Sequence, residues 1–130
     1  MILSLAFSFA EQNPIDSLKN VLKNAKEDSL KVNTLNLLSK KYFSTDPAEA
    51  VRVAEEARKL AETIDFKRGL ALALKNKGIG YYQQAEYVDA ISNWDLAKAV
   101  YDTIGDKAGV ANILNNMGAV FFNQGDDNRA

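Results

Sequence analysis

The sequence predicts an all-α protein built from antiparallel helical hairpins that stack in series. The first observation behind this prediction is an internal repeat, which places Ala50, Ala90 and Ala130 at intervals of 40 residues. The second is the spacing of apolar residues by three and four, with no alternating segment long enough to form a strand. The third is a set of capping signals ahead of the apolar segments. A repeat of this length indicates a unit that buries its apolar face only by stacking on copies of itself.

The repeat extends over a series of positions around these alanines. Its members are Lys67, Gly69, Ala71, Leu74, Asn76 and Gly78, which recur as Lys107, Gly109, Ala111, Leu114, Asn116 and Gly118. In the same register, the segment Ala85-Glu86-Tyr87 recurs as Gly125-Asp126-Asp127. We therefore expect a turn near Gly125 and the first residues of a fresh helix at Ala130.

Composition excludes several classes of chemistry. The chain has 130 residues, 16 basic and 17 acidic side chains, a formal charge of −1, and neither cysteine nor histidine. It therefore has no disulfide, no thiolate or imidazole group, and none of the nitrogen or sulfur ligands that zinc prefers. The near-neutral balance does not favour nucleic acid as a partner. We expect no enzyme activity, no metal and no cofactor.

Residues 1–10 differ from the rest of the chain. Their apolar run ends in Ser8-Phe9-Ala10, before a polar segment that begins at Glu11. Such a run followed by small residues is typical of a secretory signal peptide, although no basic residue precedes it. The alternative is an apolar lead-in that packs on the first helix. The first alternative predicts export to the periplasm, and the second leaves a cytoplasmic location open.

Capping residues place the first helices. Asn13 followed by Pro14 predicts the start of a leading helix over 14–26. Asp28 or Ser29 then begins unit one, which we place at 28–65. Its second helix starts at Asp46-Pro47, where we expect Glu49 to reach back as a capping-box partner. Farther along the same helix, Glu55 and Lys59 are expected to form an i,i+4 ion pair.

The remaining units follow from the period. Unit two covers 68–105, with helices at about 68–84 and 87–104, and a truncated unit three covers 107–130, with a helix at about 107–123. The repeat domain as a whole is assigned to 13–130. Gly78 lies in the middle of a predicted helix, where close packing against a neighbour explains it better than phosphate binding does.

Within each unit the order of small and large residues resembles that of a tetratricopeptide repeat. Unit two matches best, through Leu74, Gly78, Tyr81, Ala90, Trp94 and Ala97. The period of 40 is longer than the usual 34 of this class. The segment 105–118 is similar to the 40-residue repeats of Leu-Gly-Asn-type polarity scaffolds. It is equally similar to repeats in extracytoplasmic sensor regions of Bacteroidetes histidine kinases, adenylate cyclases and transcription regulators.

The resemblance implies a right-handed superhelix in which the first helix of each unit lines a concave groove. The groove candidates that it implies are Asn33, Asn36, Lys40, Phe43, Leu72, Lys75, Asn76, Tyr82, Gln83, Asn112, Asn115, Asn116, Phe122 and Asn123. Many of these are amides, which offer donors and an acceptor to the backbone of an extended peptide. Asn76 and Asn116 also suit a second interpretation, in which they are buried hydrogen-bonding partners between helices.

These features favour a protein- or peptide-binding module at the N-terminal part of a larger bacterial signalling protein. The carboxylate-clamp subset of the family uses basic residues where this chain has Leu72 and Asn112, so that class of partner is not expected. The alternative is a structural spacer that forms a homodimer and binds no peptide. Contact with a membrane is expected only through segments outside this chain.

Overall fold

The computed structural model describes residues 13–129, with side chains up to Gln124, and this part of the chain contains helices and no strand. The all-α class is thereby confirmed. The helices are α2 (Pro14–Lys23), α3 (Ser29–Lys41), α4 (Pro47–Thr63), α5 (Lys67–Gln83), α6 (Tyr87–Thr103) and α7 (Lys107–Arg129). None of them combines the length and apolar content needed to cross a membrane. The apolar segment 1–10 lies outside the described residues.

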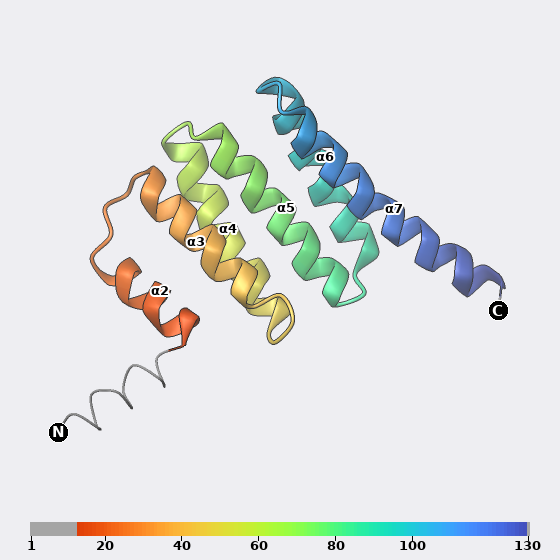
Figure 1. Cartoon of the computed structure of the whole chain (residues 1–130), viewed down its shortest axis with the longest axis horizontal. Coiled ribbons are helices and arrows are strands. Elements are labelled where there is room, and N and C mark those ends of the chain that lie inside the picture. The colour runs from red at the N-terminus through yellow and green to blue at the C-terminus, as the bar shows by residue number, and fades with distance from the viewer. Residues whose placement is uncertain (1–12, 130) are drawn as a thin grey trace.

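The helices form two layers (Figure 1). Helices α3, α5 and α7 lie toward the viewer, and α4 and α6 lie behind them. Helices α3 and α4 form one antiparallel hairpin, and α5 and α6 form the next, which packs beside it. Helix α2 packs on α3 at the N-terminal end, and α7 packs on α6 at the other end.

Local capping chemistry sets the helix starts as predicted. The side chains of Asn13, Asp28 and Asp46 each accept a hydrogen bond from a backbone N–H three residues later. Each bond satisfies one of the backbone N–H groups in the first turn of a helix that have no carbonyl partner within the helix. The leading helix ends at Lys23 rather than at residue 26, with Asn24 as its C-cap. Asparagine has low helix propensity, and the extended backbone that Asp28 needs as a cap lies only four residues further on.

The three turns that follow α4, α5 and α6 share one geometry. Each has a residue at positive φ, and these residues recur at intervals of 20: Asp65 (φ 55°), Ala85 (φ 61°) and Gly105 (φ 71°). The next backbone N–H donates to the carbonyl five residues earlier, as Phe66 does to Ala61 at 2.8 Å. This is the Schellman arrangement, which satisfies carbonyls at a helix end and reverses the chain.

Helix α7 departs from the repeat. The turn expected near Gly125 is absent, and the helix continues to Arg129. In the equivalent turn at Ala85, the following helix α6 packs against α5 and stabilises the reversal. No described helix follows α7 to pack on it in that way, and the backbone keeps its helical hydrogen bonds through Arg129.

The centre of the core is the contact between Gly78 of α5 and Trp94 of α6. Trp94 is 2% exposed, and its Nε1 donates to the backbone carbonyl of Lys75 at 3.1 Å. A Cβ added at Gly78 would lie 2.8 Å from Cε2 of Trp94 and closer still to Nε1. The prediction that close packing explains this glycine is confirmed.

The equivalent face of α7 has no such cover. Leu114 and Phe121 correspond to Leu74 and Tyr81 of α5, yet they are 50% and 61% exposed. A Cβ at Gly118 would meet no atom within 4 Å. The repeat therefore extends to the sequence of α7 but not to its packing, because no described helix lies where α6 lies on α5.

Candidate functional site

A hollow of about 340 Å³ opens between α3 and α5. Five groove candidates from the sequence lie together in it, and the sixth lining residue is Leu37 of α3, which the sequence analysis missed. We call this hollow the α3–α5 groove, and its lining residues are Asn33, Asn36, Leu37, Lys40, Leu72 and Asn76. Leu37 could have been found from its position one helical turn from both Asn33 and Lys40.

Two buried amides form the floor of the α3–α5 groove. Asn76 is 3% exposed, and its Nδ2 donates to the backbone carbonyl of Asn36 at 3.2 Å. Asn36 is 2% exposed, and its own Nδ2 donates to the carbonyl of Gly69 at 3.2 Å. These bonds join α3 to α5 across the stack. Asn76 therefore has the structural role that the sequence left open, and its side chain also borders the groove.

The rim of the groove combines apolar and polar groups. Leu37 is 52% exposed, and Asn33 and Lys40 are also exposed. Leu72 faces them from α5 and is partly buried. An exposed leucine beside the exposed amide of Asn33 is suited to hold an extended chain, since the leucine offers contact area and the amide offers donors and an acceptor.

Lys75 adds a second cationic group near Lys40. It is partly buried and lies one helical turn after Leu72 on α5. Burial lowers the pKa of Lys75 from its ordinary value, and the positive charge of Lys40 lowers this pKa further. Desolvation and a like charge both disfavour the protonated amine.

The candidates on α7 lie outside the groove. Asn112 and Asn115 are exposed, as is Phe122. Asn116 is partly exposed, and its Nδ2 is buried without a hydrogen-bond partner among the side chains described, which end at Gln124. Asn116 therefore does not repeat the bond that Asn76 makes to Asn36.

The remaining candidates are engaged elsewhere or stand apart. The hydroxyl of Tyr82 accepts a hydrogen bond from Nδ2 of Asn123 at 2.6 Å, which ties α5 to α7. The Tyr82 ring packs on Trp94 with ring centroids 6.0 Å apart, and so belongs to the packing between helices. Phe43 is partly buried in the turn after α3, and Gln83 is exposed at the last position of α5.

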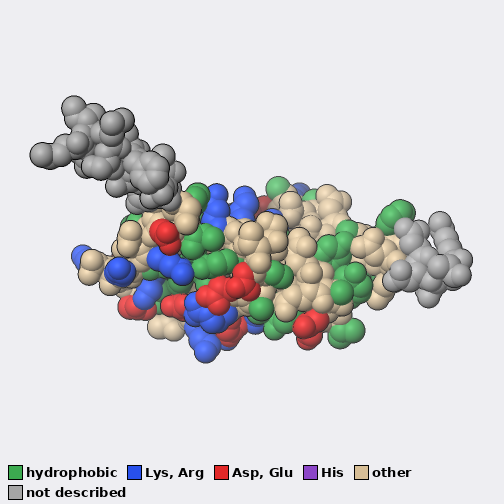
Figure 2. Space-filling view, turned by 90° about the horizontal axis from the view of Figure 1, so that it is seen from below, with side chains coloured by type: hydrophobic (Ala, Val, Ile, Leu, Met, Phe, Trp, Pro, Cys, Tyr) green, Lys and Arg blue, Asp and Glu red, His purple; other side chains and the backbone are tan. Residues whose placement is uncertain are grey.

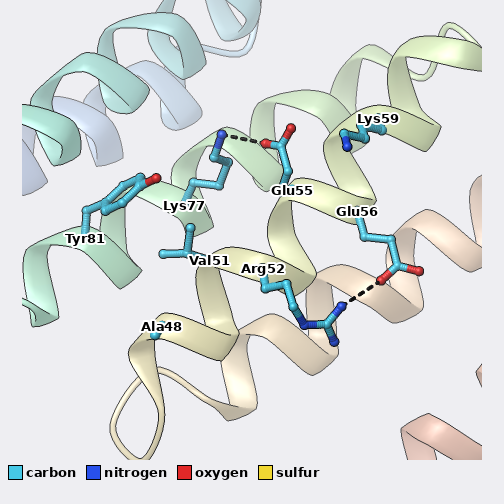
Figure 3. Close-up of a pocket in the computed structure, with 8 residues that line it drawn as sticks. All are labelled: Ala48, Val51, Arg52, Glu55, Glu56, Lys59, Lys77 and Tyr81. Carbon is cyan, nitrogen blue, oxygen red and sulfur yellow. Dashed lines mark hydrogen bonds and ion pairs between the residues drawn. The ribbon is translucent and has the colours of Figure 1, made fainter.

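A second hollow, of about 700 Å³, lies between α4 and α5 (Figure 3). Four of its five charged side chains form ion pairs with one another, and the fifth, Lys59, does not join them. Nζ of Lys77 lies 2.6 Å from Glu55, and Arg52 lies 3.7 Å from Glu56. Hydrogen bonds from Arg58, and then from Lys77, hold the pKa of Glu55 at about 2. A site whose charges are mostly paired offers little to a charged ligand.

These pairs correct two predictions for α4. Glu55 pairs with Arg58 and Lys77 and not with Lys59, because Lys77 of α5 comes within reach only in the folded stack. The carboxylate of Glu49 binds Arg52 at 2.6 Å instead of completing a capping box. The Arg52 guanidinium donates bidentate, charge-assisted hydrogen bonds to Glu49, and these are stronger than a bond from a neutral backbone N–H.

The α3–α5 groove offers hydrogen-bonding groups, two leucine side chains and the positive charge of Lys40. Among the side chains that the structure describes, residues 13–124, no group of three or more acidic residues is arranged to hold a metal ion. Comparison of the chain with protein-family models, with curated proteins and with solved structures gave no match.

Proposed function

We propose that this chain is a protein- or peptide-binding module of the tetratricopeptide-repeat type, with the α3–α5 groove as its ligand site. The proposal includes the finer fold, a right-handed superhelix of such repeats. The observation that carries it is the convergence of Asn33, Asn36, Lys40, Leu72 and Asn76 in one open hollow. The 40-residue period and the stacked hairpins support the assignment of the repeat type.

The groove favours an extended peptide over a compact ligand. Its floor is fixed by the hydrogen bonds between Asn36 and Asn76, so the site is largely formed before a ligand arrives. Leu37 and Leu72 provide apolar contact on opposite helices. Asn33 is exposed and offers its amide to a peptide backbone.

The test is a selection of binding peptides from a random library, followed by affinity measurements on groove variants. Asn33→Ala and Leu72→Ala, which are in the groove, are expected to weaken binding of a selected peptide. Asn20→Ala on exposed α2 is the matched control and should leave affinity unchanged. Selection of no peptide, or equal affinities for all three variants, would contradict the proposal.

Variants of Asn112 and Asn115 on α7 test whether the ligand site extends beyond the α3–α5 groove. Asn112→Ala and Asn115→Ala should weaken a peptide that crosses from α5 to α7. Both residues are exposed, so these variants are expected to keep the stability of the parent chain. Unchanged affinity would limit the site to the α3–α5 groove.

The second candidate function is a dimerising spacer, and the uncovered face of α7 favours it. Leu114, Phe121 and Phe122 are 50%, 61% and 68% exposed on this helix. Large exposed apolar residues on the last described helix of a stack favour contact with another protein surface. Light scattering over a concentration series tests this candidate, because a chain that stays monomeric at the highest concentration has no such contact.

The wider setting that we propose is a larger, exported bacterial signalling protein. Support comes from the apolar run over residues 1–10 and from the sequence resemblance to sensor regions. A fusion of residues 1–30 to an alkaline phosphatase without its own leader tests export. Phosphatase activity in bacteria carrying this fusion is the expected result, and its absence would favour the cytoplasmic alternative.

A further inference from the structure

Helix α7 has two apolar faces. The first is buried, since Ile113, Met117 and Val120 are at most 9% exposed and belong to the same core cluster as Trp94 of α6. The second is exposed and is called the α7 face. Its residues are Leu114, Gly118, Phe121 and Phe122. Their spacing of three and four places them on one side of the helix. An exposed apolar face of this kind favours contact with another element.

The four positions of the α7 face have counterparts on α5, and α6 covers these counterparts. They lie 40 residues earlier and are Leu74, Gly78, Tyr81 and Tyr82. Leu74 belongs to the same buried cluster as Ala90 of α6, and Tyr81 packs against that cluster. The ring of Tyr82 packs on Trp94 with ring centroids 6.0 Å apart. The contact of α5 with α6 therefore shows which kind of helix fits the α7 face.

Helix α6 fits α5 through one large and two small side chains. The indole of Trp94 occupies the space that a Cβ would take at Gly78, and its Nε1 donates to the carbonyl of Lys75 at 3.1 Å. Ala90 and Ala97, four residues before and three residues after the tryptophan, are 0% exposed. Small side chains at a contact let two helices approach closely.

The position that Trp94 fills on α5 is open on α7. A Cβ added at Gly118 would meet no atom within 4 Å. The carbonyl that corresponds to that of Lys75 belongs to Asn115. A tryptophan from outside the described residues can therefore lie over Gly118 and donate to this carbonyl.

A second folded copy of the chain does not supply such a tryptophan. Trp94 is the only tryptophan of the chain, and it is 2% exposed. Outside α7, no aromatic side chain among residues 13–124 is exposed. The phenylalanines of a second α7 have no N–H group for the carbonyl of Asn115. The chemistry of the site thus favours a different protein over a second copy.

The charge pattern is consistent with an apolar contact at this end of the stack. On the face that Figure 2 presents, acidic and basic side chains are concentrated toward the N-terminal end, and hydrophobic side chains are prominent toward the C-terminal end. Along α7 no acidic residue precedes Asp126. Binding of a helix here should therefore depend little on salt concentration.

We propose that the α7 face is a docking site for an amphipathic helix of another protein, which places a tryptophan over Gly118 and a small residue about one turn to either side. The indole N–H of this tryptophan donates to the carbonyl of Asn115, and the neighbouring side chains of the partner helix cover Leu114 and Phe121. This inference goes beyond the proposed function, because the site lies on α7 and not in the α3–α5 groove.

The probe is a fluorescently labelled peptide with the sequence of residues 86–103, which comprises α6 and its N-cap residue. It carries the pattern of tryptophan and alanine that fits α5. The parent chain should bind this peptide saturably in fluorescence anisotropy. A peptide with Trp94→Ala should bind at least about tenfold more weakly, because a buried aromatic anchor is lost.

Two leucine variants of the chain test the position of the site. Gly118→Leu fills the open position and should weaken binding of the probe at least about tenfold. Ala119→Leu is the matched control, because it adds the same side chain at the next exposed residue, about 100° further around the helix. Its affinity for the probe should change by less than about twofold. Circular dichroism verifies folding, and Leu114→Ala replaces Gly118→Leu if that variant unfolds.

The outcomes separate this docking site from a self-contact and from the groove. Absence of saturable binding, equal binding of the Trp94→Ala peptide, or equal loss of affinity in the two leucine variants would overturn the inference. A dimer of the parent chain in light scattering that Gly118→Leu abolishes would overturn it in favour of a second copy. A peptide selected on the α3–α5 groove should bind Gly118→Leu with unchanged affinity, so failure of the docking site leaves the proposed function intact.

Discussion

Two glycines 40 residues apart are predicted to respond to alanine with opposite signs. Gly78 and Gly118 occupy the same position in the repeat, one on α5 and one on α7. A Cβ at Gly78 would overlap the indole of Trp94, whereas a Cβ at Gly118 would meet nothing within 4 Å. The Gly78→Ala and Gly118→Ala variants therefore share their chemistry and differ only in packing.

The expected changes in the free energy of unfolding follow from helix propensity, overpacking and one hydrogen bond. Replacing a glycine within a helix by alanine stabilises it by about 1 kcal/mol, and this is the whole expected effect at Gly118. At Gly78 the same gain is opposed by an overpacking cost of about 1–3 kcal/mol. Displacing Trp94 also weakens its hydrogen bond to the carbonyl of Lys75, at a further cost of about 1 kcal/mol. We therefore expect Gly78→Ala to destabilise the chain by about 1–3 kcal/mol.

Urea unfolding measures both variants. Trp94 is the only tryptophan of the chain, so its fluorescence reports on this contact, and circular dichroism reports on the helices as a whole. With an m-value of about 2 kcal/mol/M, the midpoints of the two variants should differ by about 1–2 M. If Gly78→Ala were as stable as Gly118→Ala, the described packing of α5 on α6 would be wrong.

Three further predictions concern the turns, the groove floor and the ion pairs. Ala85→Gly should stabilise the chain by about 0.5–1 kcal/mol in urea unfolding. Ala85 is exposed and has φ 61°, a conformation that glycine adopts without strain. A loss of stability in this variant would contradict the prediction. Asn76→Ala should destabilise the chain by about 1–3 kcal/mol, since the buried bond to Asn36 is lost, and an unchanged melting temperature would refute the described floor. The folded-state pKa of Glu55 is about 2 against an ordinary 4.5, so its contribution to stability is present above pH 4.5 and is lost as the pH falls toward 2. The stability difference between the parent chain and Glu55→Gln should therefore shrink over this range, and a constant difference would refute the pairing with Arg58.

The candidate site was predictable in part. Asn33, Asn36, Lys40 and Asn76 could be assigned to a groove because the resemblance to tetratricopeptide repeats implies that the first helix of each unit lines one. Tyr82 was assigned to the same surface, but it packs on Trp94 and accepts a hydrogen bond from Asn123. Spacing along one helix gives the direction of a side chain and not the partner that it meets.

The sequence by itself determined the helices and their order. Asn13, Asp28 and Asp46 begin helices by accepting hydrogen bonds from backbone N–H groups three residues away. Such short-range interactions can be predicted from the order of residues in the sequence. The position of Gly78 in the middle of a predicted helix likewise indicated close packing there.

Only the tertiary structure decided which residues meet between helices. Lys77 displaces Lys59 as the partner of Glu55, and Asn76 reaches Asn36 while Asn116 reaches no partner among the described residues. Identical letters at positions 40 apart thus have different surroundings. The physical reason is that the burial and pairing of a side chain depend on the neighbouring helix. Helix α6 covers this face of α5, whereas no described helix covers the same face of α7.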